Sequence, residues 1–66
     1  MQGKVKWFDN GRGIGMIETE KGEEVTFNRI AVENAGRVSL RAKESVEFEI
    51  RKVRNWEGAI NLHVLS

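Results

Sequence analysis

Polar and apolar residues alternate one by one over much of this 66-residue chain, and this alternation restricts the fold more than any other feature. In the clearest run, residues 45–51, Val46, Phe48 and Ile50 fall on one face of an extended strand, opposite charged residues. Because successive side chains of a strand point to opposite faces, this pattern is typical of a sheet with one buried side. The chain is therefore predicted to be all-β.

Turn signals divide the chain into five short strands. We expect these strands at residues 4–8, 14–19, 24–30, 45–51 and 59–64, with turns at 9–13, 20–23 and 55–58. In the last strand, Ile60, Leu62 and Val64 are expected to share one face and His63 to be an ordinary surface residue. Residues 31–43 lack the alternation, so they are expected to form a long connection with room for one helical turn.

The length of the chain predicts one domain over residues 1–66, near the lower size limit for folding without disulfides or metal. So short a chain cannot cover two separate sheets, and its single sheet is expected to curl around one apolar interior. The predicted fold is the five-stranded antiparallel OB-fold barrel, which is small and partly open.

The composition argues against several classes of function. With no cysteine and one histidine, the chain has no thiolate or histidine metal cage and few groups for acid–base catalysis near neutral pH. No nucleophile–base pair is recognisable, so no catalytic residue, metal or cofactor is predicted. Apolar runs are only a few residues long, which argues against membrane spans and secretory signals. The absence of cysteine fits a reducing compartment, so a cytoplasmic location is expected.

The charges are nearly balanced in number but unevenly placed. Eleven basic and ten acidic residues give a formal net charge of +1. The acidic residues gather in 18–24, and the basic residues gather in 4–12, 29–43 and 51–54. This segregation allows a basic face in the folded chain, and an ordinary solvated surface explains it equally well.

Residues 12–17, Arg-Gly-Ile-Gly-Met-Ile, form the most informative segment. Ile14 and Met16 alternate with glycines, so both project from the same face of a strand, where each can meet a base. The segment follows the skeleton of the first ribonucleoprotein motif, whose platform residues are normally aromatic. Taken alone, it is better explained as a glycine-rich turn that leads into a strand. Its glycine spacing does not fit a dinucleotide-binding or P-loop motif.

The segments around this one extend the pattern. Residues 3–8 read GKVKWF, a short polar turn precedes residues 12–17, and segments 24–32 and 46–50 follow. Together they resemble the bacterial cold-shock protein family, with spacing that runs without gaps to Leu62. The resemblance implies an OB-fold that binds single-stranded RNA or DNA with low sequence specificity, as an RNA chaperone or antiterminator does. It implies no enzyme activity and no cofactor.

The chain departs from the family pattern where the family presents aromatic residues. Ile14 and Met16 replace the aromatic pair of the first motif. In the second motif, Thr26, Asn28 and Arg29 occupy the exposed Phe, His and Phe positions. Because stacking of a base on an aromatic ring is worth about 1–3 kcal/mol, these replacements are expected to weaken binding unless other residues compensate.

The resemblance leaves few aromatic residues for stacking. Trp7 and Phe8 remain, whereas Phe27 is expected to face the core. Arg37 stands where an aromatic is usual in the long loop, and like Arg29 it offers a guanidinium plane to bases and phosphates.

Further contacts come from the last turn and from basic residues. Trp56 is expected in the last turn, either as a displaced stacking platform or as a plug over the open end of the barrel. Lys6 and Arg12 occupy family positions that are basic and face the ligand, and would neutralise phosphates.

The leading prediction is therefore a monomeric binding module for single-stranded nucleic acid. Its predicted contact residues are Lys6, Trp7, Phe8, Arg12, Ile14, Met16, Thr26, Asn28, Arg29, Arg37 and Trp56. Two alternatives stay open: a fold of this family redirected to a protein partner, and an engineered variant with altered binding. An enzyme is the weakest hypothesis.

Overall fold

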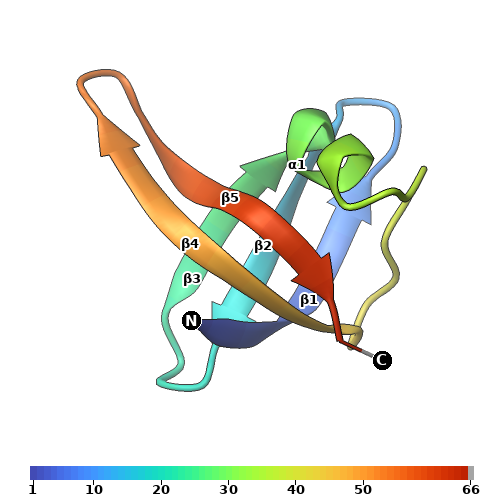
Figure 1. The fold of residues 1–66 in the computed structure, drawn as a ribbon, viewed down its shortest axis with the longest axis horizontal. Helices are drawn as coiled ribbons and strands as arrows, with labels where there is room; N and C mark the ends of the chain where they lie inside the picture. Colours follow the sequence, from blue (N-terminus) through green and yellow to red (C-terminus); the bar gives the residue numbers. More distant parts are fainter. Residues whose placement is uncertain (66) are drawn as a thin grey trace.

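The computed structural model describes residues 1–65 and shows a single antiparallel sheet with one short helix (Figure 1). Its elements are β1 (Gln2–Asp9), β2 (Ile14–Thr19), β3 (Glu24–Asn28), α1 (Arg29–Asn34), β4 (Ser45–Val53) and β5 (Trp56–Val64). The strand order is β3-β2-β1-β4-β5, and every neighbouring pair is antiparallel. The predicted fold class, a five-stranded antiparallel OB-fold, is confirmed. Within the described chain, no helix has the length and apolar character needed to span a membrane.

The sheet curls without closing. Its two edge strands, β3 and β5, approach each other, and the hydroxyl of Thr26 donates to the carbonyl oxygen of Glu57 at 3.1 Å. No backbone ladder joins these strands in residues 1–65. The β4–β5 hairpin crosses over β1, β2 and β3 and extends beyond them (Figure 1). The result is a barrel with an open seam between β3 and β5, as expected for a partly open OB-fold.

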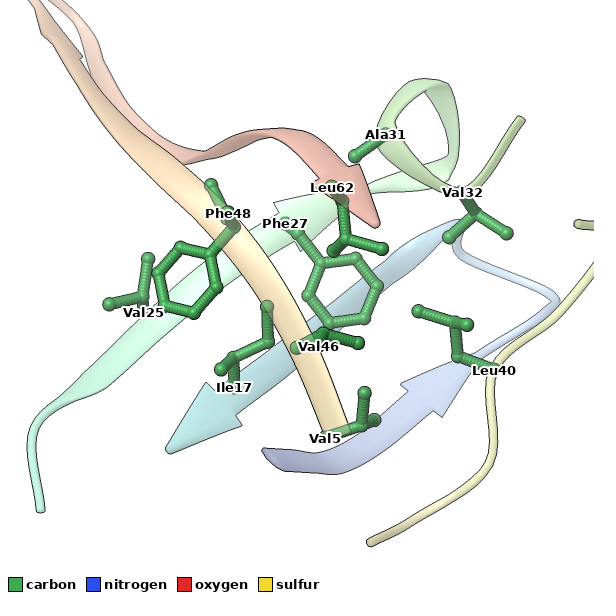
Figure 2. Close-up of a cluster of buried hydrophobic side chains, with 11 residues drawn as sticks. Val5, Ile17, Val25, Phe27, Ala31, Val32, Leu40, Val46, Phe48 and Leu62 are labelled. Atoms are coloured by element: carbon green, nitrogen blue, oxygen red, sulfur yellow. The ribbon is translucent and has the colours of Figure 1, made fainter. Parts of the chain in front are cut away.

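The inner side of the curled sheet holds the core, which Figure 2 shows as a cluster of buried side chains from every strand, α1 and the long connection. Its members are Val5, Ile17, Val25, Phe27, Ala31, Val32, Leu40, Val46, Phe48, Ala59 and Leu62. The core position predicted for Phe27 is confirmed, since only 1% of this residue is exposed. Ala31 and Val32 cover one end of the interior from α1.

The third strand ends two residues earlier than predicted. Asn28 has an extended backbone, and its side-chain oxygen accepts a hydrogen bond from the amide of Ala31 at 3.3 Å. This is an N-cap, because it satisfies one of the amides that the first turn of a helix leaves unpaired. The boundary predicted at Ile30 was wrong because the apolar Ile30 belongs to the helix that follows.

The last hairpin is tighter than predicted. Val53 pairs with Trp56, so the turn consists of residues 54 and 55, and Trp56 begins β5 instead of lying in the turn. Two-residue turns fit the twist of a hairpin well. The indole of Trp56 therefore projects from a strand.

The face expected for β5 is right for Leu62, which is buried, and for Val64, which packs against the core, but it is wrong for Ile60. A bulge between Glu47 and Glu49 breaks the β4–β5 ladder, and Asn61, opposite the break, has a φ of 50°. Ala59 before the break and Leu62 after it are buried, whereas Ile60 is only half-buried. An extra residue in one strand reverses which of the following side chains point inward. The alternation of polar and apolar residues in the sequence does not show where such a residue lies. His63 is exposed, as predicted.

Candidate nucleic-acid interface

The outward side of β1, β2 and β3, here called the outer face, carries a row of three side chains in register. Trp7 pairs with Met16, and Met16 pairs with Thr26. Directly opposed residues on neighbouring strands have Cβ atoms about 4.5–5.5 Å apart, so the three side chains form a continuous surface. Trp7 is 43% exposed. The structure therefore brings together three residues that the sequence proposed for contact with bases.

A second row lies beside the first. Ile14 pairs with Asp9 on β1 and with Asn28 on β3. Ile14 is exposed, so its apolar side chain is open to a ligand next to that of Met16. The first row is apolar on β1 and β2 and polar on β3, whereas the second row is apolar only on β2, between Asp9 and Asn28.

A bulge in β1 turns Trp7 outward. The register shifts between Val5 and Trp7, so Lys6 is the extra residue, and Lys6 and Trp7 are both exposed. On either side of them, Val5 is buried and Phe8 is half-buried. The ring of Phe8 stacks on the core residue Phe27, with centroids 5.6 Å apart. Phe8 thus packs against the core while Trp7 projects to solvent.

Gly15 on β2 allows the backbones of β1 and β2 to lie close to the ring of Phe27. A Cβ atom added at Gly15 would meet the ring of Phe27 and would lie 2.7 Å from the carbonyl oxygen of Trp7. Only glycine fits this space without movement of the neighbouring backbone. The aromatic pair of Phe8 and Phe27 can therefore support the outer row from beneath.

Arg29 joins the start of α1 to the turn between β1 and β2. Its guanidinium donates to the carbonyl oxygen of Asn10, and its amide donates to the carbonyl oxygen of Gly13 at 2.8 Å. The Arg29 side chain lies over Gly13, whose φ is +71°. The guanidinium is exposed in this position, so it presents a fixed positive charge at one end of the outer face.

The turn between β1 and β2 is held in shape by its first residue. A carboxylate oxygen of Asp9 accepts hydrogen bonds from the amides of Gly11 at 2.9 Å and Arg12 at 3.1 Å. A side chain that bonds to its own following backbone is a common way to fix a turn. Arg12 is exposed next to this fixed backbone, so the turn adds a second cation at the end where Arg29 lies.

The opposite end of the outer face is partly acidic. Lys6, proposed from the sequence as a phosphate contact, is bound to Glu24 on β3 at 2.5 Å. Hydrogen bonding and charge attraction from Glu24 raise the pKa of Lys6, and Glu18 adds a smaller attraction. Lys6 therefore already has a carboxylate partner. The sequence analysis missed Glu24, although Glu24 shares the outward alternation of Thr26 two residues later.

Arg37 supports the long connection. Its guanidinium donates to Glu44 at 3.0 and 3.3 Å, and the same carboxylate accepts from the amide of Arg41 at 2.6 Å. The hydrogen bond from the Arg41 amide, assisted by Arg37, lowers the pKa of Glu44 despite its partial burial. Arg37 is half-buried and takes part in the structure of the loop.

Trp56 lies at the open seam between β5 and β3. A Cβ atom added at Gly58 would lie 2.5 Å from Cζ2 of Trp56 and 2.8 Å from the carbonyl oxygen of Thr26. The indole thus covers Gly58 beside the β3 end of the outer row. Trp56 is 37% exposed, so part of its side chain covers the seam and the rest is open to solvent.

These groups can stack on bases, contact apolar surfaces and pair with phosphates. Among residues 1–65, no group of three His, Cys, Asp or Glu side chains is placed to hold a metal ion.

Comparison with known proteins adds an independent finding. The family model described as the "'Cold-shock' DNA-binding domain" matches residues 1–65. The chain is 37% identical to a cold shock-like protein of Thermotoga maritima over 66 residues, which covers all of both chains. It is 48% identical to cold shock protein CspD of Bacillus subtilis over 48 residues, or 73% of each chain. It is 32% identical to the major cold shock protein of Streptococcus pyogenes over 65 residues, or 98% of this chain and 97% of that protein.

Proposed function

The chain belongs to the "'Cold-shock' DNA-binding domain" family and binds nucleic acid, and from this premise we propose that it holds single-stranded RNA or DNA across its outer face. The observation that carries the proposal is the row of Trp7, Met16 and Thr26 on three adjacent strands, with Trp56 beside its end. A single strand exposes the flat faces of its bases, which an exposed indole and a thioether can contact.

The affinity is proposed to combine one strong stack with several weaker contacts. Stacking on Trp7 supplies about 1–3 kcal/mol for one base. Ile14 and Met16 add apolar contact without a π-system. Arg12 and Arg29 supply the salt-dependent attraction to phosphates at the end of the face away from Glu24.

The predicted contact residues fall into two groups under this proposal. The ligand is contacted directly by Trp7, Arg12, Ile14, Met16, Thr26, Asn28, Arg29 and Trp56. Phe8, by contrast, supports the outer face from beneath, and Arg37 holds the loop. Lys6 reaches a phosphate only by leaving Glu24.

The proposed activity is binding without catalysis. A strand held in extended form is removed from the pool that folds into hairpins, so the protein opposes base pairing by mass action, as an RNA chaperone or antiterminator does. Sequence specificity is proposed to be low, because stacking accepts every base. We further propose that the protein acts as a cytoplasmic monomer and needs no cofactor.

A fluorescence titration tests this proposal. The Trp56→Phe variant, in which Trp7 is the only tryptophan, is titrated with oligo-dT and oligo-U at two salt concentrations, with a duplex of mixed sequence as the control. We expect saturable quenching by both single strands, weaker at higher salt, and much weaker quenching by the duplex. A folded protein that shows no quenching and no competition at low salt would refute the proposal.

A further inference from the structure

We propose that a hollow between α1 and β5, beside Trp56, takes one unstacked nucleobase of the bound strand and reads its edge. This inference rests on the function proposed above and adds to it a source of base preference. The hollow has a volume of about 230 Å³ and is lined in part by Asn28, Ile30, Asn34, Trp56, Ala59 and Asn61. Pockets for drug-sized ligands span roughly 300–1,000 Å³, so this space suits a single planar ring.

The lining has the chemistry that recognises a base. Trp56 contributes an aromatic side chain to the lining, and Ile30 and Ala59 contribute apolar contact. Asparagine amides carry both a donor and an acceptor, as does the edge of a nucleobase. An aromatic plane combined with amide groups is the usual means by which proteins recognise an unstacked base.

The three asparagines differ in how much of their hydrogen-bonding capacity is free. The side-chain oxygen of Asn28 caps α1, and the amide nitrogen of Asn61 donates to Glu49 at 2.7 Å. Asn34 lies exposed at the last residue of α1, and within residues 1–65 no hydrogen bond occupies its side chain. Asn34 is therefore the residue best able to discriminate between bases.

The position of the hollow connects it to the proposed path of the strand. Asn28 lines the hollow and also ends the second row of the outer face, opposite Ile14. Trp56 lines the hollow and lies beside Thr26, at the end of the first row. A strand that crosses from β1 to β3 thus reaches the hollow without a gap, and its next base can turn into it.

Affinity for a panel of oligonucleotides tests the inference. Homopolymers of A, C, T and U of equal length are titrated at one salt concentration against the wild type, Asn34→Ala, Trp56→Leu and Trp7→Leu. Gln2→Ala is the matched control, because it removes an exposed amide from β1 at a position outside the hollow.

We expect Asn34→Ala to reduce the differences in affinity among the homopolymers by about threefold or more, and Trp56→Leu to weaken binding of all of them by about fivefold or more. Gln2→Ala should change neither. Mononucleotides at millimolar concentration should leave the fluorescence of Trp56 unchanged in the Trp7→Phe variant, because the base is delivered by a bound strand. Strong quenching by mononucleotides would overturn the inference in favour of a free-nucleotide site.

The outcomes separate this inference from the proposed function. If the wild type binds and Trp7→Leu weakens binding, while Asn34→Ala and Trp56→Leu behave as Gln2→Ala does, the hollow takes no base and the outer face still binds the strand. If the folded wild type binds none of the oligonucleotides, the inference and the proposed function are both refuted.

Discussion

The two sides of β1, β2 and β3 show how one set of strands serves two purposes. The inner side is closely packed, and Val5, Ile17 and Phe27 are almost completely buried there. The outer face exposes Trp7 and Ile14 next to polar and charged groups. Because neighbouring residues point to opposite sides, a substitution on one side has little effect on the other. The aromatic positions of the family pattern that this chain has replaced on these strands lie on the outer face, where the fold tolerates the exchange.

The largest expected effect is on the inner side. Phe27→Ala removes a fully buried ring, and such a change costs about 3–5 kcal/mol of unfolding free energy. Small domains have a total stability of only about 5 kcal/mol, so we expect the variant to be largely unfolded. Urea denaturation followed by circular dichroism measures this loss. A variant that keeps wild-type stability would show that the inner side is not the core.

Trp7→Leu tests the opposite side of the comparison. We expect the affinity for oligo-dT to fall by about 1–3 kcal/mol, because one base loses its stack, while the unfolding free energy changes by less than about 0.5 kcal/mol. Paired titration and denaturation measurements check both values. A large loss of stability together with unchanged binding would reverse the roles assigned to the two sides.

Glu44→Gln sharpens the comparison at Arg37, a predicted contact residue that instead pairs within the loop. The variant is expected to lose about 1 kcal/mol of stability at pH 7, because a charged partner of Arg37 and Arg41 is removed. Denaturation of the variant and the wild type at a series of pH values measures the effect.

The stabilisation that Glu44 provides is expected to change with pH in one direction. The pKa of Glu44 is lower in the folded protein than its ordinary value, because the amide of Arg41 and the guanidinium of Arg37 stabilise the carboxylate. Its contribution to the unfolding free energy is therefore complete above the pKa of the unfolded chain and is lost as the pH falls through the pKa of the folded protein. The difference between wild type and variant should therefore shrink at acid pH. A difference that grows below pH 4 would show that Glu44 is not stabilised as a carboxylate.

Glu24→Gln should have the smallest effect. The change frees Lys6 and removes a negative charge from the outer face, so we expect binding of oligo-dT to tighten by about two- to fivefold at low salt and less at high salt. Glu47→Gln, an exposed carboxylate on β4, serves as the control. Weaker binding of the Glu24 variant alone would mean that Glu24 itself contacts the ligand.

The sequence predicted the inner side better than the outer face, and the reason is physical. Burial imposes a strict period, so β2 and the inward position of Phe27 follow from alternation alone. The bulge in β4–β5 and the cap at Asn28 depend on long-range pairing and local hydrogen bonds, which no period records.

On the outer face, the sequence supplied candidate residues but not their partners. The shared face of Ile14 and Met16 follows from the strand period. The pairing of Lys6 with Glu24 and of Arg37 with Glu44 joins residues that are 18 and 7 positions apart in the chain. Such pairs depend on side-chain positions that only the folded structure brings together.

Amide chemical-shift mapping of the labelled protein with oligo-dT tests the division between the two sides most directly. We expect the largest shifts at Trp7, Ile14, Met16 and Thr26, smaller ones near Arg29 and Trp56, and little change at the β4 residues Glu47 and Glu49. Shifts gathered on β4, with the residues of the outer face unchanged, would contradict the assignment of the outer face as the nucleic-acid-binding surface.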